Sequence, residues 1–279
     1  MTSPAGLTVV HPTDLSPDSH VAFAHALKLA LAGRGKLKIM HVEAGAAEVD
    51  WDNFPQVRAT LARWGLLPPG SSREDVVKLG LGVEKIVFPG EKPASAIPEY
   101  LRQRHVDLMV LATHQRDGLD RWFAESVAEP LARRSRVRTL FVPGSRPGFT
   151  SLADGSITFK RVLIPIDGVP SPQYAIRAAA ELAQLLEQGQ VAFQLLHIGD
   201  RMPTVGVPER SGWSWDRVLR TGDVVAEILG VAAHDAVDLI VMATQGHRGV
   251  LDALRGSTTE RVVRGSACPV LAVPAVEAE

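Results

Sequence analysis

The sequence lacks the residues that would cross-link the chain covalently or hold it in a membrane. Its single cysteine, Cys268, excludes an intramolecular disulfide and a cysteine-rich zinc site, and suits a reducing compartment. No stretch approaches the roughly 18 consecutive apolar residues that a membrane span requires. The first residues, MTSPAGLTVV, have neither the basic nor the apolar region of a signal peptide. We therefore expect a soluble cytoplasmic protein.

An excess of charge of either sign is also missing. Thirty basic residues face 31 acidic ones, so the net charge is −1 and no electrostatic argument favours nucleic acid or an anionic membrane as a partner. The order of residues shows no Ser-His-Asp or Cys-His arrangement and no paired carboxylates, so we expect no catalytic residues. Three predicted strands of the first copy end at His11, His41 and His114, but the spacing of these histidines is not a zinc signature. Packed or surface histidines are the favoured interpretation, with a metal site as the alternative.

The sequence contains an internal repeat, in which two copies of one unit follow each other. DLMVLAT at 107–113 returns as DLIVMAT at 238–244, and VVHPTD at 9–14 is echoed by LIPID at 163–167. In the second echo Asp14 matches Asp167. The repeat predicts two domains, 1–144 and 160–279, joined by a linker at 145–159 that is rich in Gly, Ser and Thr.

Each copy alternates short apolar runs with longer amphipathic segments. The runs are rich in Val, Ile and Leu without polar alternation, which is typical of parallel strands buried on both faces. This pattern predicts an α/β fold with two doubly wound, five-stranded parallel sheets. The predicted strands are Leu7–Pro12, Leu37–Val42, Val83–Phe88, Asp107–Ala112 and Thr139–Val142, then Val162–Ile166, Val191–Ile198, Asp216–Arg220, Asp238–Ala243 and Val270–Val273.

The copies differ in length, because the second is shorter by about 25 residues after its second strand. In the first copy this span predicts two helices, Phe54–Trp64 and Ser71–Leu79, and a further helix is expected at Ser126–Arg134. In the second copy the corresponding stretch, RMPTVGVPERSGW at 201–213, is rich in Pro and Gly and predicts a loop.

A candidate phosphate loop follows the fourth strand of the second copy. Ala243 leaves room for a ligand, Gly246 permits a tight turn, and Gly256 with Ser257 opens a helix whose N–H groups and dipole favour phosphate. No Gly-Lys-Ser/Thr follows, so this is not a Walker A loop. The alternative is a glycine turn with a serine cap that binds nothing.

Asp167 ends the first strand of the second copy. In a doubly wound sheet of order 3-2-1-4-5, this position faces the glycine loop across the crevice where strand order reverses. A carboxylate there suits a hydrogen bond to a ribose hydroxyl or an adenine amine. A helix N-cap or turn residue in IDGVPSP is the alternative, and both roles are compatible.

These motifs resemble the universal stress protein family, and the resemblance covers both halves, as in a tandem member. It rests on PID (165–167), HI (197–198), MATQG (242–246), GST (256–258) and CPVLAVP (268–274). The family's Gly-x2-Gly-x9-Gly-Ser/Thr pattern falls on the second copy, with Ala replacing the first glycine. The resemblance implies Rossmann-like domains of strand order 3-2-1-4-5, whose last strands pair as an intramolecular pseudo-dimer. The implied ligand residues are Pro165, Asp167, Ile198, Ala243, Gly246, His247, Gly249, Gly256, Ser257 and Thr258.

The first copy shows a degraded form of the same motif. Gln115 and Glu125 stand at the two glycine positions, before Ser126. A carboxylate at Glu125 would occupy the helix N-terminus and repel phosphate, so the first copy is not expected to bind ATP in the family manner. Asp14 and Val42 retain the nucleoside positions.

The resemblance implies a stress-responsive regulatory protein that binds ATP, ADP or AMP with Mg²⁺ in its second domain. It also implies an unidentified protein partner, in a monomeric pseudo-dimer or a homodimer. Two alternatives remain: a slow ATPase-type enzyme of the adenine-binding α/β group, and a scaffold that binds no nucleotide. No obvious general base or arginine finger is present, so hydrolysis is expected to be weak at most.

Overall fold

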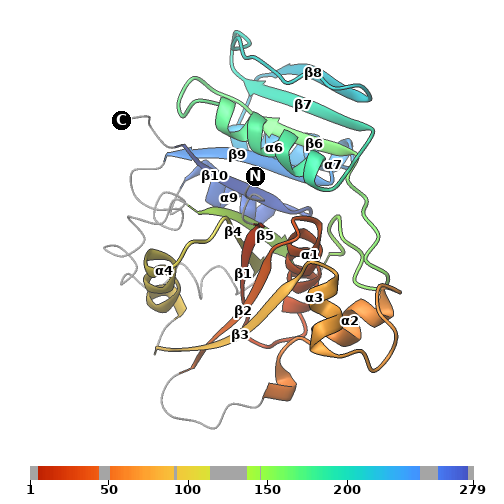
Figure 1. Ribbon diagram of the computed structural model, residues 1–279. Helices are drawn as coiled ribbons and strands as arrows, with labels where there is room; N and C mark the ends of the chain where they lie inside the picture. The colour runs from red at the N-terminus through yellow and green to blue at the C-terminus, as the bar shows by residue number, and fades with distance from the viewer. Residues whose placement is uncertain are drawn as a thin grey trace.

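A computed structural model describes residues 6–43, 51–90, 93–113, 137–144, 146–245 and 257–275. Its strands form one ten-stranded sheet in the order β3-β2-β1-β4-β5-β10-β9-β6-β7-β8. Figure 1 shows the two halves stacked along this sheet, with the N-terminal half below and the C-terminal half above. Each half has the order 3-2-1-4-5, which confirms the predicted doubly wound architecture.

The first domain contains five parallel strands and four helices in its described residues. The strands are β1 (Thr8–Pro12), β2 (Lys36–Glu43), β3 (Gly82–Pro89), β4 (Leu108–Thr113) and β5 (Arg138–Pro143). The helices are α1 (Ser19–Ala32), α2 (Val57–Arg63), α3 (Arg73–Lys78) and α4 (Pro93–Gln103), with a short 3₁₀ turn at Trp51–Asn53. The predicted helix at 126–134 lies outside the described residues.

The second domain repeats the pattern with a shorter connection. Its strands are β6 (Arg161–Pro165), β7 (Val191–Ile198), β8 (Trp213–Arg220), β9 (Leu239–Gln245) and β10 (Val270–Ala275). Its described helices are α6 (Gln173–Leu185), α7 (Val224–His234) and α9 (Thr258–Gly265). No helix separates β7 from β8, all of whose connecting residues are described. β8 begins three residues before its predicted start because Trp215 stacks on Phe193 of β7, with ring centroids 4.2 Å apart.

The final strands of the two copies join the halves. β5 and β10 run antiparallel, with Leu140 opposite Leu271 and Phe141 opposite Val270. All other neighbouring strands are parallel. The strand pairing of the predicted pseudo-dimer is therefore confirmed.

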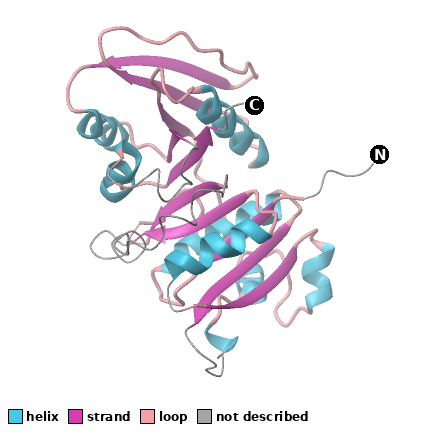
Figure 2. Ribbon diagram, turned by 90° about the vertical axis from the view of Figure 1, so that its left-hand side faces the viewer, coloured by secondary structure: helices cyan, strands magenta, loops and turns pink. Residues whose placement is uncertain are grey.

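Helices cover both faces of the shared sheet, as Figure 2 shows. One apolar cluster includes residues of α1 and α6, and the other includes residues of α4, α7 and α9. Each cluster runs through both domains. Burial on both faces explains why the strands read as unbroken apolar runs. None of the described helices has the length and apolar character needed to cross a membrane.

The segment between the domains packs firmly onto the first. Phe149 and Phe159 are fully buried, and a bridge pairs Thr150 with Ile157. The Nε2 atom of His25 on α1 accepts hydrogen bonds from the backbone N–H groups of Phe149 and Thr150, each at 3.1 Å. This clasp fixes the start of the inter-domain segment against α1.

A fragment that ends at residue 148 tests the pairing of β5 with β10. Without β10, the outer edge of β5 is exposed, and unpaired strand edges associate with one another. We expect residues 1–148 to self-associate or aggregate through this edge, which β10 covers in the whole chain. A well-behaved monomeric fragment in analytical ultracentrifugation would count against the pairing of β5 with β10.

Candidate functional site

A pocket of about 290 Å³ lies at the carboxyl ends of β6 and β9. These strands are neighbours in the sheet, and strand order reverses between them. In open α/β sheets this reversal point is where ligands bind. The pocket brings together six of the ten predicted ligand residues: Pro165, Asp167, Ile198, Ala243, Ser257 and Thr258.

The other four, Gly246, His247, Gly249 and Gly256, lie outside the described residues. The same holds for Gln115, Glu125 and Ser126, on which the predicted defect of the first copy rests. The comparison between the two phosphate loops therefore remains a prediction from sequence.

One wall of the pocket is apolar. Val224 and Ile228 come from α7, Met242 from β9 and Ile198 from the end of β7. Such a surface suits a flat, weakly polar ring. Sequence analysis missed the two α7 residues, because an amphipathic helix pattern identifies an inward face without saying which pocket it lines.

Asp167 supplies the single carboxylate of the described lining. Its Oδ1 accepts a hydrogen bond from the N–H of Gly168 at 2.7 Å, which orients the carboxylate in the lining of the pocket. Its other oxygen has no partner among the described residues. Asp167 is therefore a turn residue that keeps an acceptor for a ligand, so both predicted roles are compatible with its geometry.

Ser257 is the N-cap of α9, and its hydroxyl accepts a hydrogen bond from the N–H of Glu260 at 3.2 Å. The serine cap of the alternative interpretation is thus present. Thr258 and Thr259 also line the pocket. Because they stand in the first turn of α9, their N–H groups have no acceptor within the helix. A capped helix N-terminus in a pocket favours an anionic group beside it.

The histidine near the end of the second strand has the same structural role in both copies. In the second copy, Nδ1 of His197 lies 2.9 Å from the carbonyl oxygen of Ile166. In the first copy, Nδ1 of His41 lies 2.9 Å from that of Thr13. Each ring ties the end of one strand to the loop that follows its neighbour.

The third histidine of the metal hypothesis, His114, lies outside the described residues. His11 is fully buried, and its Nδ1 lies 3.0 Å from the carbonyl oxygen of Val110. Among the described residues, no three metal-ligating side chains cluster together. Nδ1 of His11 and of His41 each bonds a backbone oxygen of a neighbouring strand or loop, and Nε2 of His41 also lies 3.1 Å from Oε2 of Glu43. These contacts are compatible with the packing role that the sequence favours.

The sequence pattern of universal stress proteins matches residues 7–143 and 205–274, which together make up most of the chain. The chain belongs to the universal stress protein family. Its two matched regions and two domains make it a tandem universal stress protein. The second match begins after β7, so Asp167 and Ile198 fall outside it.

Two curated relatives are universal stress proteins. MJ0531 of Methanocaldococcus jannaschii is 26% identical over 149 residues, which cover 44% of this chain and 86% of that protein. YxiE of Bacillus subtilis is also 26% identical over 149 residues, covering 41% of this chain and 99% of the relative. Each relative therefore corresponds to about one half of this tandem protein.

Solved structures resemble the whole chain. A universal stress protein from Archaeoglobus fulgidus aligns with a TM-score of 0.60 at 17% identity, covering 96% of this chain and 98% of that one. A putative universal stress protein from Pseudomonas aeruginosa gives a TM-score of 0.58 at 16% identity, with 96% and 92% covered. At this identity the likeness establishes the shared fold.

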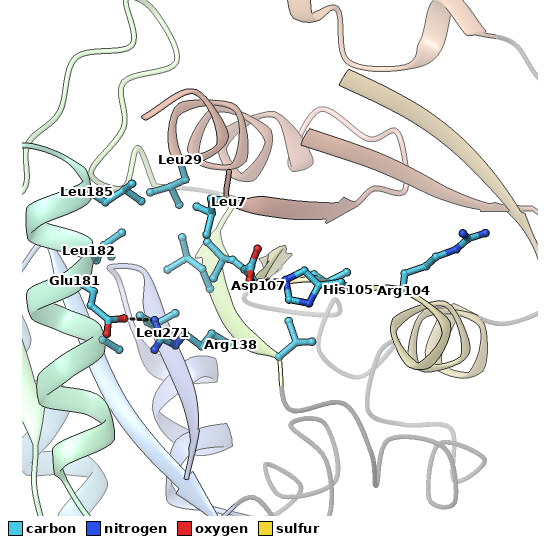
Figure 3. Close-up of a pocket in the computed structure, with 15 residues that line it drawn as sticks. Leu7, Leu29, Arg104, His105, Asp107, Arg138, Glu181, Leu182, Leu185 and Leu271 are labelled. Atoms are coloured by element: carbon cyan, nitrogen blue, oxygen red, sulfur yellow. Dashed lines mark hydrogen bonds and ion pairs between the residues drawn. The ribbon is translucent and has the colours of Figure 1, made fainter. Parts of the chain in front are cut away.

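A second cavity of this universal stress protein, of about 650 Å³, lies where the two domains meet (Figure 3). Leucines line much of it: Leu7, Leu29, Leu108, Leu140, Leu182, Leu185 and Leu271. Arg138 of β5 reaches Glu181 of α6 across its rim at 2.5 Å. Because the cavity adjoins the amino ends of β1 and β4, it is not at the edge where these sheets bind nucleotides.

The aspartate that opens both DL motifs lies at this edge. Oδ2 of Asp107 accepts a hydrogen bond from the N–H of Thr8 at 2.8 Å. Oδ2 of Asp238 accepts bonds from the N–H groups of Lys160 and Arg161 at 2.7 and 2.9 Å. In both copies the carboxylate anchors the start of the neighbouring strand, so its repetition has a structural cause.

Proposed function

We propose that the second domain of this universal stress protein binds an adenine nucleotide, with the base on the apolar wall and the phosphates at the start of α9. The observation that carries the proposal is the convergence of Asp167, Ile198 and Ser257 on one pocket at the strand-order reversal. These three residues come from distant parts of the chain. The family's nucleotide pattern assigns each of them a separate part of the same ligand.

The dimensions of the pocket agree with such a division. About 290 Å³ is just below the range of ligand sites, roughly 300–1,000 Å³, which suits a pocket that holds one part of the ligand. A nucleoside fills the space between the α7 wall and Asp167. The phosphates then lie beside Ser257 and Thr258, where Mg²⁺ would neutralise part of their charge.

Regulation by ATP, ADP or AMP in response to stress, rather than catalytic turnover, is the function we propose. In the described lining, the only carboxylate is Asp167 and no lysine or arginine is present. Fast phosphoryl transfer requires positioned cations and a group that orients the attacking water. Multiple-turnover phosphate release would instead favour the slow ATPase, and native protein purified without nucleotide and unaffected by ATP would favour the scaffold.

Replacing Gly256 by glutamate copies the residue of the first domain into the second. It adds a negative charge directly before the N-cap Ser257, where phosphate should bind. Loss of one charge-assisted contact costs on the order of 1.5–3 kcal/mol, so ATP affinity should fall at least about tenfold. Isothermal titration calorimetry of the whole chain measures this, and we expect one nucleotide per parent chain.

Asp167→Asn is the matched variant for the other end of the ligand. It should weaken the binding of adenosine and of ATP alike, whereas Gly256→Glu should weaken ATP and spare adenosine. Two equivalent sites per chain would contradict the difference between the domains. Unchanged ATP affinity in Gly256→Glu, with an unchanged melting temperature, would show that the glycine-serine turn is structural only.

A further inference from the structure

The helices that distinguish the first domain from the second build a groove. A cavity of about 790 Å³ lies between the α2–α3 pair and β3. Its lining includes Lys36, Arg58, Arg73, Val77, Val83 and Lys85. The second domain joins β7 to β8 through residues 199–212 without a helix, so it has no counterpart of the helical wall. The groove is thus a property of one copy only.

Positive charge dominates this groove. Four cationic side chains line it, against one carboxylate, Glu84, which lies 3.9 Å from Lys38. Arg58 donates to the backbone oxygen of Ser71 at 3.2 Å. In the described part of the chain, no carboxylate lies within ion-pair distance of Lys36, Arg58 or Arg73. An anionic partner would supply the missing charge.

Lys85 is the most enclosed of the four cations. Its Nζ donates to the backbone oxygen of Trp51 at 3.4 Å and lies 5.5 Å from the ring centroid of Phe54. Burial lowers the pKa of Lys85; Asp52 opposes this shift and Arg58 adds to it. An anion in the groove would stabilise the charged ammonium.

The groove follows β3, which has one strand neighbour, β2, among the described residues. β3 is the outermost strand, and the N–H groups of Gly82 and Gly90 bond toward β2, to Gly35 and Glu43. Because strand residues alternate in direction, the backbone groups of Val83 and Lys85 face away from β2. The four consecutive residues 82–85 of β3 line the groove, which places it along the strand.

Apolar surface accompanies the charge. Val77 of α3 is 60% exposed, and Val83 of β3 is half-buried beside it in the lining. A small anion would leave this surface uncovered. An extended chain whose alternate side chains are acidic would direct these toward the cations, with their methylene groups over the valines, while its backbone pairs with β3.

We propose that this groove receives an extended acidic segment of a partner protein, which adds to β3 as a further strand. The backbone edge supplies the hydrogen bonds, and the four cations select for acidic side chains. The surface belongs to the first domain, and its argument is independent of nucleotide binding in the second.

Fluorescence anisotropy with the whole chain tests this, using a fluorescein-labelled ten-residue peptide of alternating glutamate and valine. We expect saturable binding with one peptide per chain, which weakens as salt is raised. The same peptide with lysine in place of glutamate should not bind. Absence of binding by the glutamate peptide at low salt would overturn the proposal.

Charge reversal locates the binding surface. Arg58→Glu with Arg73→Glu should lower peptide affinity by at least about tenfold, because two attractive charges become repulsive. Both side chains are exposed, so the fold should be retained. Arg177→Glu with Arg201→Glu, at exposed positions of the second domain, changes the net charge by the same amount; it is the matched control and should leave the affinity unchanged. Equal losses in both variants would contradict the assignment of the groove.

Backbone pairing is tested on the probe, which avoids any change to the fold. Two peptides are compared, one methylated on the backbone nitrogens of its odd residues and the other on those of its even residues. Each keeps every charge and loses the hydrogen-bond donors along one edge of the peptide strand. One of the two methylation patterns should abolish binding and the other should not. If both methylated peptides bind as well as the parent peptide, strand addition is wrong and the groove is a general anion site. The same conclusion follows if polyphosphate of equal charge competes with equal affinity.

Discussion

Replacing His25 by leucine is expected to destabilise the chain by about 3 kcal/mol, because two buried N–H groups lose their acceptor and each costs roughly 1–3 kcal/mol. Nε2 of His25 accepts from Phe149 and Thr150, and Nδ1 lies 2.7 Å from the carbonyl oxygen of Val21. Leucine fills a similar space without either nitrogen. Chemical denaturation of the whole chain measures the loss.

Hydrogen exchange identifies the clasp as the cause. The amides of Phe149 and Thr150 should lose protection in His25→Leu, more than amides in the second domain. His25→Gln keeps an acceptor and should recover part of the stability. His234→Gln, an exposed histidine on α7, is the control. Unaltered exchange at the two linker amides in His25→Leu would show that the clasp contributes nothing.

Gly148 makes the clasp possible. It has φ +61°, and a side chain there would place Cβ within 2.5 Å of the His25 ring. Gly148→Ala should therefore reproduce the loss of protection at Phe149 and Thr150 without touching the histidine. A variant with normal exchange at these amides would contradict the geometry of the clasp.

Acid should unfold the protein through two buried histidines. Burial lowers the pKa of His11 and of His25 from 6.5 to about 4. The hydrogen bond to Val110 and the charge of Asp14 oppose the shift at His11, while His20 adds to it. The hydrogen bond to Val21 opposes the shift at His25. Both side chains therefore fold in the neutral form.

The direction of the pH effect follows from proton uptake. Between pH 6.5 and 4 the unfolded chain binds these two protons and the folded chain does not, so stability falls as pH is lowered. Each histidine contributes about 3 kcal/mol of loss by pH 4, out of a typical total of 5–15 kcal/mol. Denaturant titrations at pH 7, 6, 5 and 4 measure this slope.

The lower end of the titration provides a control. Asp75 and Asp154 are exposed, and hydrogen bonds hold the pKa of each at about 2. The largest contribution to this lowering comes from Lys78 at Asp75 and from Ser151 at Asp154. Their protonation affects stability only below the histidine window. His25→Gln should reduce the slope between pH 6.5 and 4 by about half, since one of two proton sites is removed. An unchanged slope would assign the acid sensitivity to other groups.

Much of the fold follows from local sequence patterns. The strands buried on both faces were predictable because parallel sheets impose unbroken apolar runs, and the repeated DL segments located matching strands. The packing of the linker was not. Its Gly, Ser and Thr content indicates a flexible connection, whereas Phe149 and Phe159 are fully buried. Two aromatics in a polar segment were the available signal.

The candidate site divides in the same way. Asp167, Ile198 and Ser257 were predictable because each stands at a strand end or helix start, positions that the sheet topology brings together. Val224 and Ile228 were not, because their place beside Met242 depends on how α7 crosses the sheet. Tertiary packing, rather than any local motif, decides which face of a helix closes a pocket.

The antiparallel pairing of β5 with β10 has a consequence for how the two halves of the protein can evolve. In a symmetric homodimer every substitution appears twice, so an insertion beside one edge strand would also appear beside the other. Here a covalent tandem places two independently varying copies in one sheet. One end, β3, carries the α2–α3 insertion, and the other end, β8, carries a loop. The two ends of the sheet therefore differ in structure, which is impossible in a symmetric pair of identical subunits.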